Sequence, residues 1–419
     1  MKILVLGNGA REHSIAWKLR QFSHDIYLHP GNAGTLKLGF LNLAPAHHTA
    51  ELIAQARSKQ IELIIIGPEA LLVEDYATHF RQAGFLVLGP GREGAQLESS
   101  KVFSKEFMVR AGVPTADFKI YQNFEEFKIG VQNLPFPKVL KLDGLAAGKG
   151  VVIAKNASQA FEFAENVWTR HLFGNSAHKI IEEEFIPGVE LSYLGLCDGE
   201  TFIPLSSSTD FKRVFDKDEG PNTGGMGAIS PSPYLNSELE KKINQSITKP
   251  ILQTLKKENL DFRGVLYIGI MIDKNHNPFV LEFNTRFGDP ETQSLMMRIN
   301  NDPLPALLAT AQGKLNSAPP IDWKKDTAVY VVAASPGYPE NPKIGSVISG
   351  TEMKTPQTEI FFAGVSSKDG KLLTSGGRVL GVGALGKDCS EARDRAYQRL
   401  KQISWAGIHY RTDIGISST

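Results

Sequence analysis

Cysteine is nearly absent from this sequence, which has only Cys197 and Cys389 in 419 residues. Two cysteines so far apart disfavour both a disulfide framework and a thiolate metal site. Net charge is also nearly absent, because 46 Lys and Arg residues balance 45 Asp and Glu residues. A surface for nucleic acid or for a membrane usually carries an excess of one sign. We therefore expect small-molecule ligands and no nucleic-acid partner.

Long apolar runs are missing as well. No run approaches the roughly 18 residues of a membrane span. Met1 leads straight into a strand pattern without the hydrophobic region of a signal peptide. These absences predict no membrane partner and a location in the reducing cytoplasm.

The chain length of 419 residues predicts about three domains, at roughly 150 residues each. The N-terminal part alternates helical patterns with short apolar runs that stop at a glycine, which is typical of a parallel sheet in a βα fold. Ligands of such sheets bind beyond the carboxyl ends of the strands. The apolar runs are residues 3–6, 63–66 and 86–88, and the helical patterns include residues 12–22 and 49–59.

The loops at these strand ends are rich in small residues and comprise residues 7–13, 29–34 and 67–69. Small residues let backbone N–H groups approach a phosphate, and a helix beginning near Arg11 would direct its positive end toward it. A nicotinamide dinucleotide fits poorly, because Glu12 replaces the third glycine of G-x-G-x-x-G and His29 replaces the acidic residue after the second strand. A mononucleotide or sugar phosphate fits better. The alternative is that these glycines serve only tight βα turns.

The most informative segment is residues 280–292, VLEFNTRFGDPET. It begins as a strand, and strand alternation directs Glu282 and Asn284 to one face, as two oxygen ligands suited to Mg²⁺. Arg286 follows at the same spacing, where its guanidinium can meet a carboxylate or a phosphoryl group. Residues 288–291 then form a turn that carries two more carboxylates. The alternative is an edge strand that ends in a polar turn.

A glycine-rich hairpin lies earlier in the chain. Strand patterns at residues 137–142 and 151–154 enclose residues 143–150, a loop with three glycines and a lysine. Such a loop can fold its amides over a phosphate. It is not a Walker loop, because Gly150 follows Lys149 where Ser or Thr would stand. A flexible hairpin is the alternative.

Three further features precede the metal-binding pattern in the sequence. Residues 180–192 predict a strand leading into an acidic linker, with a solvated edge as the alternative. Residues 210–213 and 220–227 predict a second glycine-rich loop with cations nearby, which suits an anionic substrate. Residues 264–272 predict a buried strand that pairs with the strand carrying Glu282.

The order of these motifs resembles the ATP-grasp superfamily: a glycine loop between strands, an E-E-F-x-x-G-x-E linker and an E-F-N-x-R-F-G-D-P-E strand. Within it, the chain resembles the phosphoribosylamine-glycine ligase family, also called glycinamide ribonucleotide synthetases, from residue 1 to residue 415. Ala10, Phe211 and Thr285 depart from that family's usual glycine, histidine and cysteine. The similar segments are residues 7–13, 30–35, 141–152, 220–231 and 281–293.

The resemblance implies an α/β protein with the ATP-grasp fold. Residues 1–100 would form an N-terminal parallel-sheet βα domain, and residues 101–326 the ATP-grasp domain, with a mobile lid at about residues 115–188. Residues 327–419 would form a small C-terminal β-rich domain. There, Arg378 follows two glycines and either reaches a substrate phosphate or lies in a surface turn.

The resemblance also implies an activity, the ATP-dependent ligation of glycine to 5-phosphoribosylamine in purine biosynthesis. Glycyl phosphate would be the intermediate, and glycinamide ribonucleotide, ADP and phosphate the products. The cofactors would be ATP and Mg²⁺ or Mn²⁺. The partners would be the small-molecule substrates, and we expect a monomer, with transient contacts to other purine enzymes left open.

The family's site residues carry over to matching positions of this sequence, with the following implied roles. The residues for ATP are Lys105, Lys141, Gly148, Lys149 and Gly150 at the phosphates, Glu183, Glu184 and Phe185 at the adenine, and Glu190 at the ribose. The metal ligands are Glu282 and Asn284. The catalytic residues, which orient glycine and its acyl phosphate, are Arg286, Lys141, Asp210 and Lys212. The residues for phosphoribosylamine are Asn8, Gly9, Asn32 and Glu69.

Two rival functions remain at this stage. One is another ATP-grasp enzyme whose activated acid is bicarbonate, which the loops at residues 210–213 and 222–226 disfavour. The other is a nucleotide-sensing binding protein with degraded chemistry. The presence of Lys141, Glu282, Asn284 and Arg286 argues against this second function.

Overall fold

The computed structural model describes residues 1–46, 48–132, 134–144, 150–173 and 179–416. None of the helices in these ranges is long and apolar enough to cross a membrane. The predicted residues Gly148 and Lys149 lie outside the described residues.

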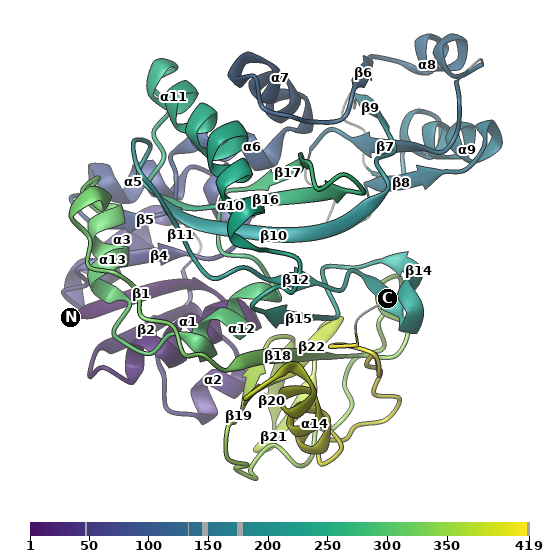
Figure 1. Ribbon diagram of the computed structural model, residues 1–419. Helices are drawn as coiled ribbons and strands as arrows, with labels where there is room; N and C mark the ends of the chain where they lie inside the picture. Colours follow the sequence, from purple (N-terminus) through teal and green to yellow (C-terminus); the bar gives the residue numbers. More distant parts are fainter. Residues whose placement is uncertain (47, 133, 145–149, 174–178, 417–419) are drawn as a thin grey trace.

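The N-terminal part is a five-stranded parallel sheet in the order β3-β2-β1-β4-β5, which confirms the predicted βα alternation (Figure 1). Its strands are β1 (Lys2–Gly7), β2 (Asp25–Pro30), β3 (Leu41–Asn42), β4 (Leu63–Ile66) and β5 (Leu86–Leu88). Its helices are α1 (Ala10–Arg20), α2 (Ala33–Lys37), α3 (Thr49–Ser58), α4 (Glu69–Val73), α5 (Tyr76–Gln82) and α6 (Arg92–Ser99).

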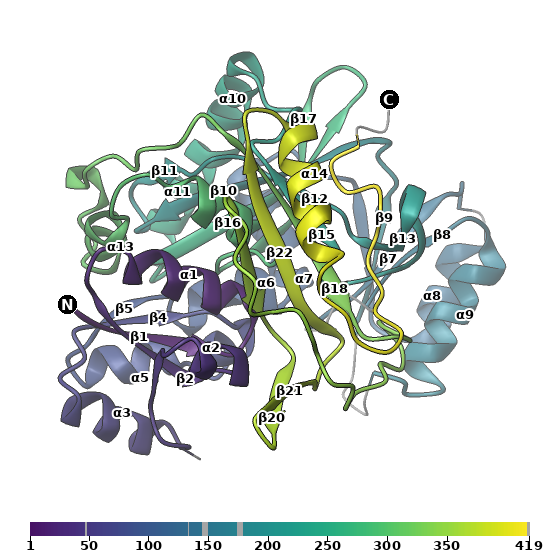
Figure 2. The same cartoon turned by 90° about the horizontal axis from the view of Figure 1, so that it is seen from below.

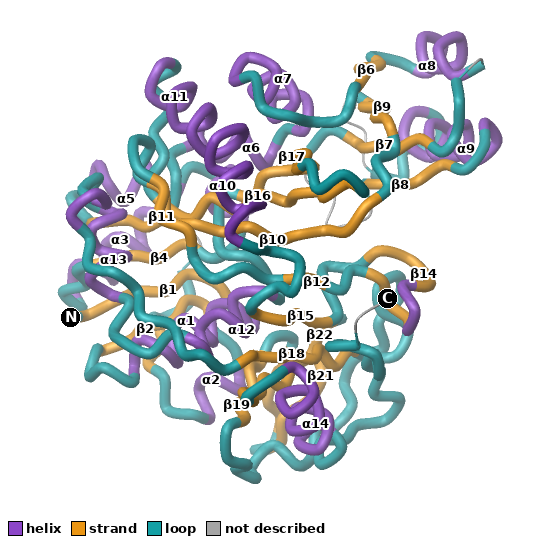
Figure 3. Tube along the Cα trace, viewed as in Figure 1, coloured by secondary structure: helices purple, strands orange, loops and turns teal. Residues whose placement is uncertain are grey.

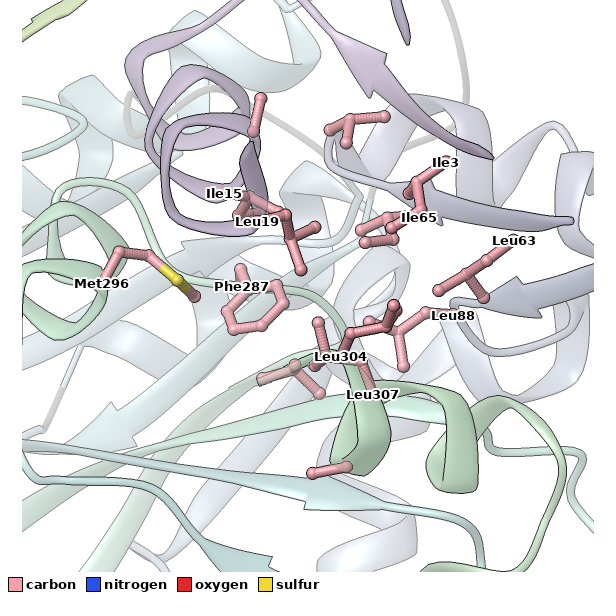
Figure 4. Packing of buried hydrophobic residues seen from close by; sticks show 14 of the residues in the cluster. Ile3, Ile15, Leu19, Leu63, Ile65, Leu88, Phe287, Met296, Leu304 and Leu307 are labelled. Atoms are coloured by element: carbon pink, nitrogen blue, oxygen red, sulfur yellow. The ribbon is translucent and has the colours of Figure 1, made fainter. Parts of the chain in front are cut away.

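The core under this sheet joins it to the end of the metal-binding pattern and to the chain that follows it. Ile3 and Ile65 of the sheet and Leu19 of α1 pack against Phe287 and Leu304, all of them buried (Figure 4). Each fully buried aliphatic side chain contributes roughly 1.5–3 kcal/mol. This shared core holds the glycine loops of the N-terminal sheet close to the end of the strand that carries Glu282 and Asn284.

The central sheet is antiparallel, in the order β11-β10-β16-β17, and the predicted pairing of residues 264–272 with the Glu282 strand is confirmed. The register shifts beside Gly269, which pairs with Glu282, while Ile270 pairs with Val280. The strands are β10 (Gly188–Cys197), β11 (Phe202–Pro204), β16 (Gly264–Asp273) and β17 (Pro278–Asn284). The helices that pack nearby are α7 (Lys101–Ala111), α10 (Ser237–Ile243) and α11 (Lys249–Lys257), the last two joined by a π-helical turn (Asn244–Thr248).

Helix α7 has clear start and stop signals. The Ser100 hydroxyl accepts a hydrogen bond from the backbone N–H of Phe103, which caps the first turn. Gly112 ends the helix in the left-handed conformation, with a φ of 66° that favours glycine. The helix therefore begins directly after its capping serine and ends at Ala111.

A third sheet, in the order β6-β9-β7-β8, carries two helices on its outer side (Figures 1 and 3). It has an apolar core of its own, with Tyr121, Phe127 and Phe163 buried. Its elements are β6 (Phe118–Tyr121), α8 (Phe124–Val131), β7 (Lys138–Leu142), β8 (Val151–Ala154), α9 (Ala157–Trp168) and β9 (Ile180–Glu184). This sheet falls within the predicted lid at about residues 115–188, whose movement stays a prediction.

The C-terminal sheet, β12-β15-β18-β22-β19, combines strands from before and after residue 327. Helix α14 (Cys389–Leu400) lies along β18 and β22 (Figure 2). The strands are β12 (Thr209–Asp210), β15 (Gly227–Ser230), β18 (Thr327–Ala334), β19 (Thr358–Phe362) and β22 (Arg378–Gly386). Smaller elements are β13 (Arg213–Phe215), β14 (Glu219–Asn222), β20 (Val365–Lys368), β21 (Lys371–Thr374), two 3₁₀ turns (Asp216–Asp218 and Leu315–Ser317), α12 (Glu291–Arg298) and α13 (Leu304–Ala311).

One predicted loop differs from expectation. Residues 220–222 belong to β14, which pairs with β13 through Arg213 and Asn222. The glycine-rich loop is thereby shortened to residues 223–226, between β14 and β15. Pairing with a neighbouring strand overrides the weak strand propensity of glycine and proline here.

Candidate active site

The two predicted metal ligands lie together at the end of β17. Glu282 and Asn284 both line a cavity of about 220 Å³, the central cavity, and Phe283 between them, which also borders it, is buried in the apolar core beside Phe107. Burial would raise the pKa of the Glu282 carboxyl, but Lys212 and Lys141 outweigh it and lower that pKa. Two oxygen donors, one of them ionised, therefore face a single cavity.

The predicted phosphate lysines share one carboxylate. Lys105 Nζ lies 3.1 Å and Lys141 Nζ 2.9 Å from the Glu183 carboxylate, and all three side chains are buried. Lys141 also donates to the carbonyl of Leu281, and Lys105 to the hydroxyl of Thr115. Burial lowers the pKa of Lys105 to about 8, although Glu183 opposes the shift. The Glu183 carboxylate, expected at the adenine, is thus bound to the two lysines.

A larger space, the outer cavity of about 860 Å³, adjoins the central one and shares Lys141, Glu183 and Glu282 with it. Its volume lies within the roughly 300–1,000 Å³ of small-molecule sites. The outer cavity brings together most of the predicted nucleotide residues, namely Lys141, Glu183, Glu184, Phe185 and Glu190. Gly150 lines the central cavity.

Lys212 lines both cavities and lies close to two carboxylates. Its Nζ lies 2.6 Å from the Glu190 carboxylate and 3.8 Å from the Glu282 carboxylate. Burial would lower the pKa of Lys212, but these two carboxylates outweigh it and raise that pKa. Lys212 therefore keeps its charge beside the predicted metal ligand.

Arg286 is held by two carboxylates rather than left open. Its guanidinium lies 2.8 Å from Glu98 and 3.2 Å from Glu69, and it donates to Asn284 Oδ1 at 3.1 Å. Glu69, expected at the phosphoribosylamine, thus lines the central cavity beside Arg286. Glu98 was not predicted, because its partner Arg286 lies far away in sequence and no local pattern links them. Thr285 also contacts Glu98, which places its hydroxyl away from the cavity-facing pair.

Asp210 lies beside a buried network of polar side chains. The Tyr267 hydroxyl donates to the Glu291 carboxylate at 2.6 Å, and the Ser192 hydroxyl lies 3.2 Å from the same carboxylate. Burial, and next Glu291, raise the pKa of Asp210 well above its usual value. Asp210 Oδ1 has no hydrogen-bond partner among the described residues. Asp210 also lines the central cavity, so this carboxyl lies beside the space that a ligand would occupy.

A separate space of about 290 Å³, the N-terminal cavity, is lined by the glycine loop after β1 and by strands of the C-terminal sheet. Asn8 and Gly9, expected at the phosphoribosylamine, line it, but Asn32 is not among its lining residues. The Asn32 amide donates to the carbonyls of Asn8 and Phe362, and its oxygen accepts from Thr35 N–H. Asn32 therefore supports the loop.

Glu12 explains why a dinucleotide fits poorly. Its carboxylate accepts a hydrogen bond from the backbone N–H of Gly9 at 2.8 Å and another from Arg11 at 2.6 Å. A Cβ at Gly67 would overlap this carboxylate, and one at Gly7 would lie 2.5 Å from its side chain. The Glu12 side chain therefore stands where the third glycine of a dinucleotide motif would be, and it packs between Gly7 and Gly67.

Arg378 does not lie in a surface turn but is the first residue of β22. Its guanidinium donates to the carbonyls of Gly224 and Asp289 and lies 3.1 Å from the Asp289 carboxylate. It also lines the N-terminal cavity. Burial would lower the pKa of Arg378, but Asp289 above all raises it. The arginine therefore ties the C-terminal sheet to the shortened glycine loop and to the turn before α12.

These features define an ATP-grasp enzyme: two sheets around a cavity that holds buried lysines and an acid–amide pair on one strand. Family models of phosphoribosylglycinamide synthetase match nearly all of the chain, the N domain at residues 1–98, the ATP-grasp (A) domain at 99–292 and the C domain at 328–417. The chain therefore belongs to the phosphoribosylglycinamide synthetase, or phosphoribosylamine-glycine ligase, family. Its activity is the ATP-dependent ligation of glycine to 5-phosphoribosylamine in purine biosynthesis.

Individual relatives agree over the full length. A phosphoribosylamine-glycine ligase of Clostridium acetobutylicum is 42% identical and covers 100% of both chains, and one of Vibrio parahaemolyticus is 41% identical over 99% of this chain and 98% of its own. The crystal structure of the Thermotoga maritima enzyme superposes with a TM-score of 0.87 at 35% identity, over 99% of this chain and 100% of that one. A biotin carboxylase domain from Hydrogenobacter thermophilus, at 17% identity and a TM-score of 0.72, covers 98% of this chain and 91% of its own and shares the fold alone.

Proposed function

We propose that the ligation proceeds through glycyl phosphate, which forms in the central cavity from glycine and the γ-phosphate of ATP. The observation that carries this proposal is the convergence of Glu282, Asn284, Lys141, Lys212 and Arg286 on that one cavity. Phosphoryl transfer depends mainly on positioning and on charge neutralisation, and these side chains supply both.

The donor set of β17 fits Mg²⁺ or Mn²⁺. Hard cations prefer carboxylate and amide oxygens, and Glu282 and Asn284 present one of each on the same strand face. Among the described residues no group of three or more His, Cys, Asp or Glu side chains could hold a metal ion, so phosphate and water oxygens would complete the shell. A metal bound there would neutralise charge on the outer phosphates of ATP.

The nucleotide would extend from the central into the outer cavity. Lys105 and Lys141 would bind its phosphates, and Glu183 would hold the two ammonium groups in place. Glu184 and Phe185 would lie along the adenine, and Glu190 would accept hydrogen bonds from the ribose hydroxyls. Their common position on the wall of the outer cavity supports this assignment.

The two acceptor substrates would occupy different ends of the site. Arg286 and Lys212 would orient the glycine carboxylate toward the γ-phosphate, and Asp210, which lines the same cavity, would accept from the glycine ammonium group. Phosphoribosylamine would lie in the N-terminal cavity against Asn8 and Gly9. Asn32 would contribute by holding the Asn8 loop in place, and Glu69 by holding Arg286.

We propose the domain division predicted from the sequence, with residues 115–188 as a lid that closes over ATP. The separate apolar core of this sheet supports movement as a unit. We also propose a monomer, because the described residues of one chain line all three cavities. The cytoplasmic location stays a prediction from the sequence.

Isotope transfer tests the acyl phosphate. A glycine carboxylate oxygen bridges to phosphorus in glycyl phosphate and leaves with it, so glycine labelled with ¹⁸O in its carboxylate should deliver label to inorganic phosphate, with ADP as the nucleotide product. Mass spectrometry after a single turnover reads both products. A reaction without phosphoribosylamine provides the control. Unlabelled phosphate, or label in AMP, would contradict the proposal.

A further inference from the structure

Asp289 occupies the junction between the two substrate cavities. Among the described residues, it is the one residue that lines both the central cavity and the N-terminal cavity. It belongs to the turn between β17 and α12, and none of the roles assigned above uses it. An acyl group formed in the central cavity and an amine held in the N-terminal cavity must meet at this junction.

The Asp289 carboxylate is held in a fixed orientation. Arg378 contacts Oδ2 at 3.1 Å and Gln293 donates to Oδ1 at 2.7 Å. A Cβ at Gly9 would lie 3.8 Å from Oδ2, so this oxygen faces the glycine loop at van der Waals distance from it. The side chain is 18% exposed, which leaves an approach for a ligand from the cavity side.

The charge of this carboxylate is also secured. Burial would raise the pKa of Asp289, but Arg378 and then Arg11 outweigh it and lower that pKa. The group is therefore an ionised hydrogen-bond acceptor at neutral pH. Preorganised charges of this kind contribute most where charge develops during a reaction.

We propose that Asp289 accepts a hydrogen bond from the amine of phosphoribosylamine and stabilises the positive charge that develops on its nitrogen during attack. The proposal rests on the glycyl phosphate route given above. The nitrogen lone pair forms the C–N bond to the glycyl carbonyl, and the C–O bond to the phosphoryl group breaks. The electron pair leaves with the phosphate, and the surplus proton of the nitrogen passes to that phosphate. No further reactant is needed.

The test separates formation of glycyl phosphate from its consumption. Wild type and Asp289→Asn are mixed with ATP, glycine and saturating phosphoribosylamine in a single turnover. Samples quenched into hydroxylamine convert glycyl phosphate into glycine hydroxamate, while ADP and glycinamide ribonucleotide are measured in parallel. Asp289→Asn should form ADP at a rate within a few fold of wild type and accumulate hydroxamate. Its acyl transfer should slow by roughly 10²–10³-fold, as for loss of one preorganised electrostatic group.

Three outcomes would overturn the proposal. Equal slowing of ADP formation and acyl transfer would place Asp289 on glycine or ATP instead, and unchanged transfer would remove it from the reaction. A transfer defect of the same size in Arg378→Met would mean that the carboxylate acts only by holding the arginine. If Asp289→Asn fails to fold by circular dichroism, Asp289→Ser takes its place in the same assay.

A matched control variant and the ¹⁸O-transfer experiment keep the test of Asp289 distinct from the test of glycyl phosphate itself. Glu291 is a carboxylate two residues further on that lines the central cavity but not the N-terminal one. Glu291→Gln should therefore accumulate no hydroxamate. Absence of label transfer from glycine to phosphate in wild type would contradict the glycyl phosphate route itself, whereas transfer in wild type without accumulation in Asp289→Asn would contradict only the role of Asp289.

Discussion

Acid should destabilise this protein through His13. The side chain is 1% exposed, and its Nδ1 accepts a hydrogen bond from the backbone N–H of Phe362 at 2.9 Å. It lies against the rings of Phe40, Phe361 and Phe362, between α1 and β19. Burial lowers the pKa of His13 to about 3 from an ordinary value of 6.5. A protonated ring there would lose the acceptor and place a charge among aromatic side chains.

The sign and the size of the effect follow from proton linkage. Below pH 6.5 the unfolded chain protonates His13 while the folded chain does not, so the stability present above pH 6.5 is lost progressively as the pH falls toward 3. Between pH 7 and pH 5 this group alone should lower the free energy of unfolding by about 2 kcal/mol. That loss is substantial against the roughly 5–15 kcal/mol of a typical domain.

Urea unfolding of wild type and His13→Asn, followed by tryptophan fluorescence at pH 7 and pH 5, measures this contribution. The carboxamide introduced by this substitution would keep an acceptor for Phe362 N–H but could not titrate, so the variant should lose about 2 kcal/mol less than wild type over this interval. His79→Asn, at a histidine outside the buried core, is the matched control and should follow wild type. Parallel pH dependence of wild type and His13→Asn would refute the reasoning.

Three further predictions concern the proposed site. Glu282→Gln should reduce ADP formation by about 100-fold or more while circular dichroism stays unchanged, because a neutral amide is a weaker ligand for a hard cation; near-native turnover at low Mg²⁺ would exclude it from the site. Glu183→Gln should lower stability by about 3–5 kcal/mol in urea unfolding, since it leaves two buried lysines without their shared carboxylate; stability equal to wild type would count against that ion pair. Gly67→Ala should displace Glu12 from the glycine loop and raise the KM for phosphoribosylamine, and an unchanged KM would argue against the loop as its site.

Short strands bounded by glycine were predictable from the sequence. Residues 63–66 and 86–88 are strands with these same bounds, and the hairpin at residues 137–142 and 151–154 is nearly as predicted. In each, an apolar run is long enough for a strand and too short for a helix, and a glycine or proline marks its end.

Helix α12 shows what the sequence could not reveal. Its sequence ETQSLMMR has no apolar face, yet all of its residues are buried. Local hydrogen bonds permit this, since the Thr292 hydroxyl donates to the carbonyl of Gly288 and the Ser294 hydroxyl to that of Glu291. The Arg298 guanidinium donates hydrogen bonds to the carbonyls of Asp326 and Lys324, which lie outside the helix. Hydrophobic periodicity cannot detect a helix whose polar groups are satisfied in this way.

The same limit applies to the charged residues of the site. The motif identified which side chains face the cavity, but the carboxylate that each cation holds comes from another element. Glu183 on β9 binds lysines from α7 and β7, and Glu98 on α6 binds Arg286 beyond β17. Sequence separation hides such pairs, so the sequence indicated neither the ion pairs of Glu183 nor any role for Glu98, and the place of Glu183 at the adenine stays a prediction.

These pairs suggest how the cavity keeps several cations close together before ATP binds. Lys212 is matched by Glu190, Arg286 by Glu98, and Arg378 by Asp289. Without such partners, buried cations would repel one another and lose their positive charge or their positions. On the proposed route, a triphosphate would approach side chains that are already oriented, so little reorganisation would be needed when charge moves during phosphoryl transfer. In the proposed site, the carboxylates would thus matter for catalysis even where they bind no substrate, because they hold the side chains that would bind it.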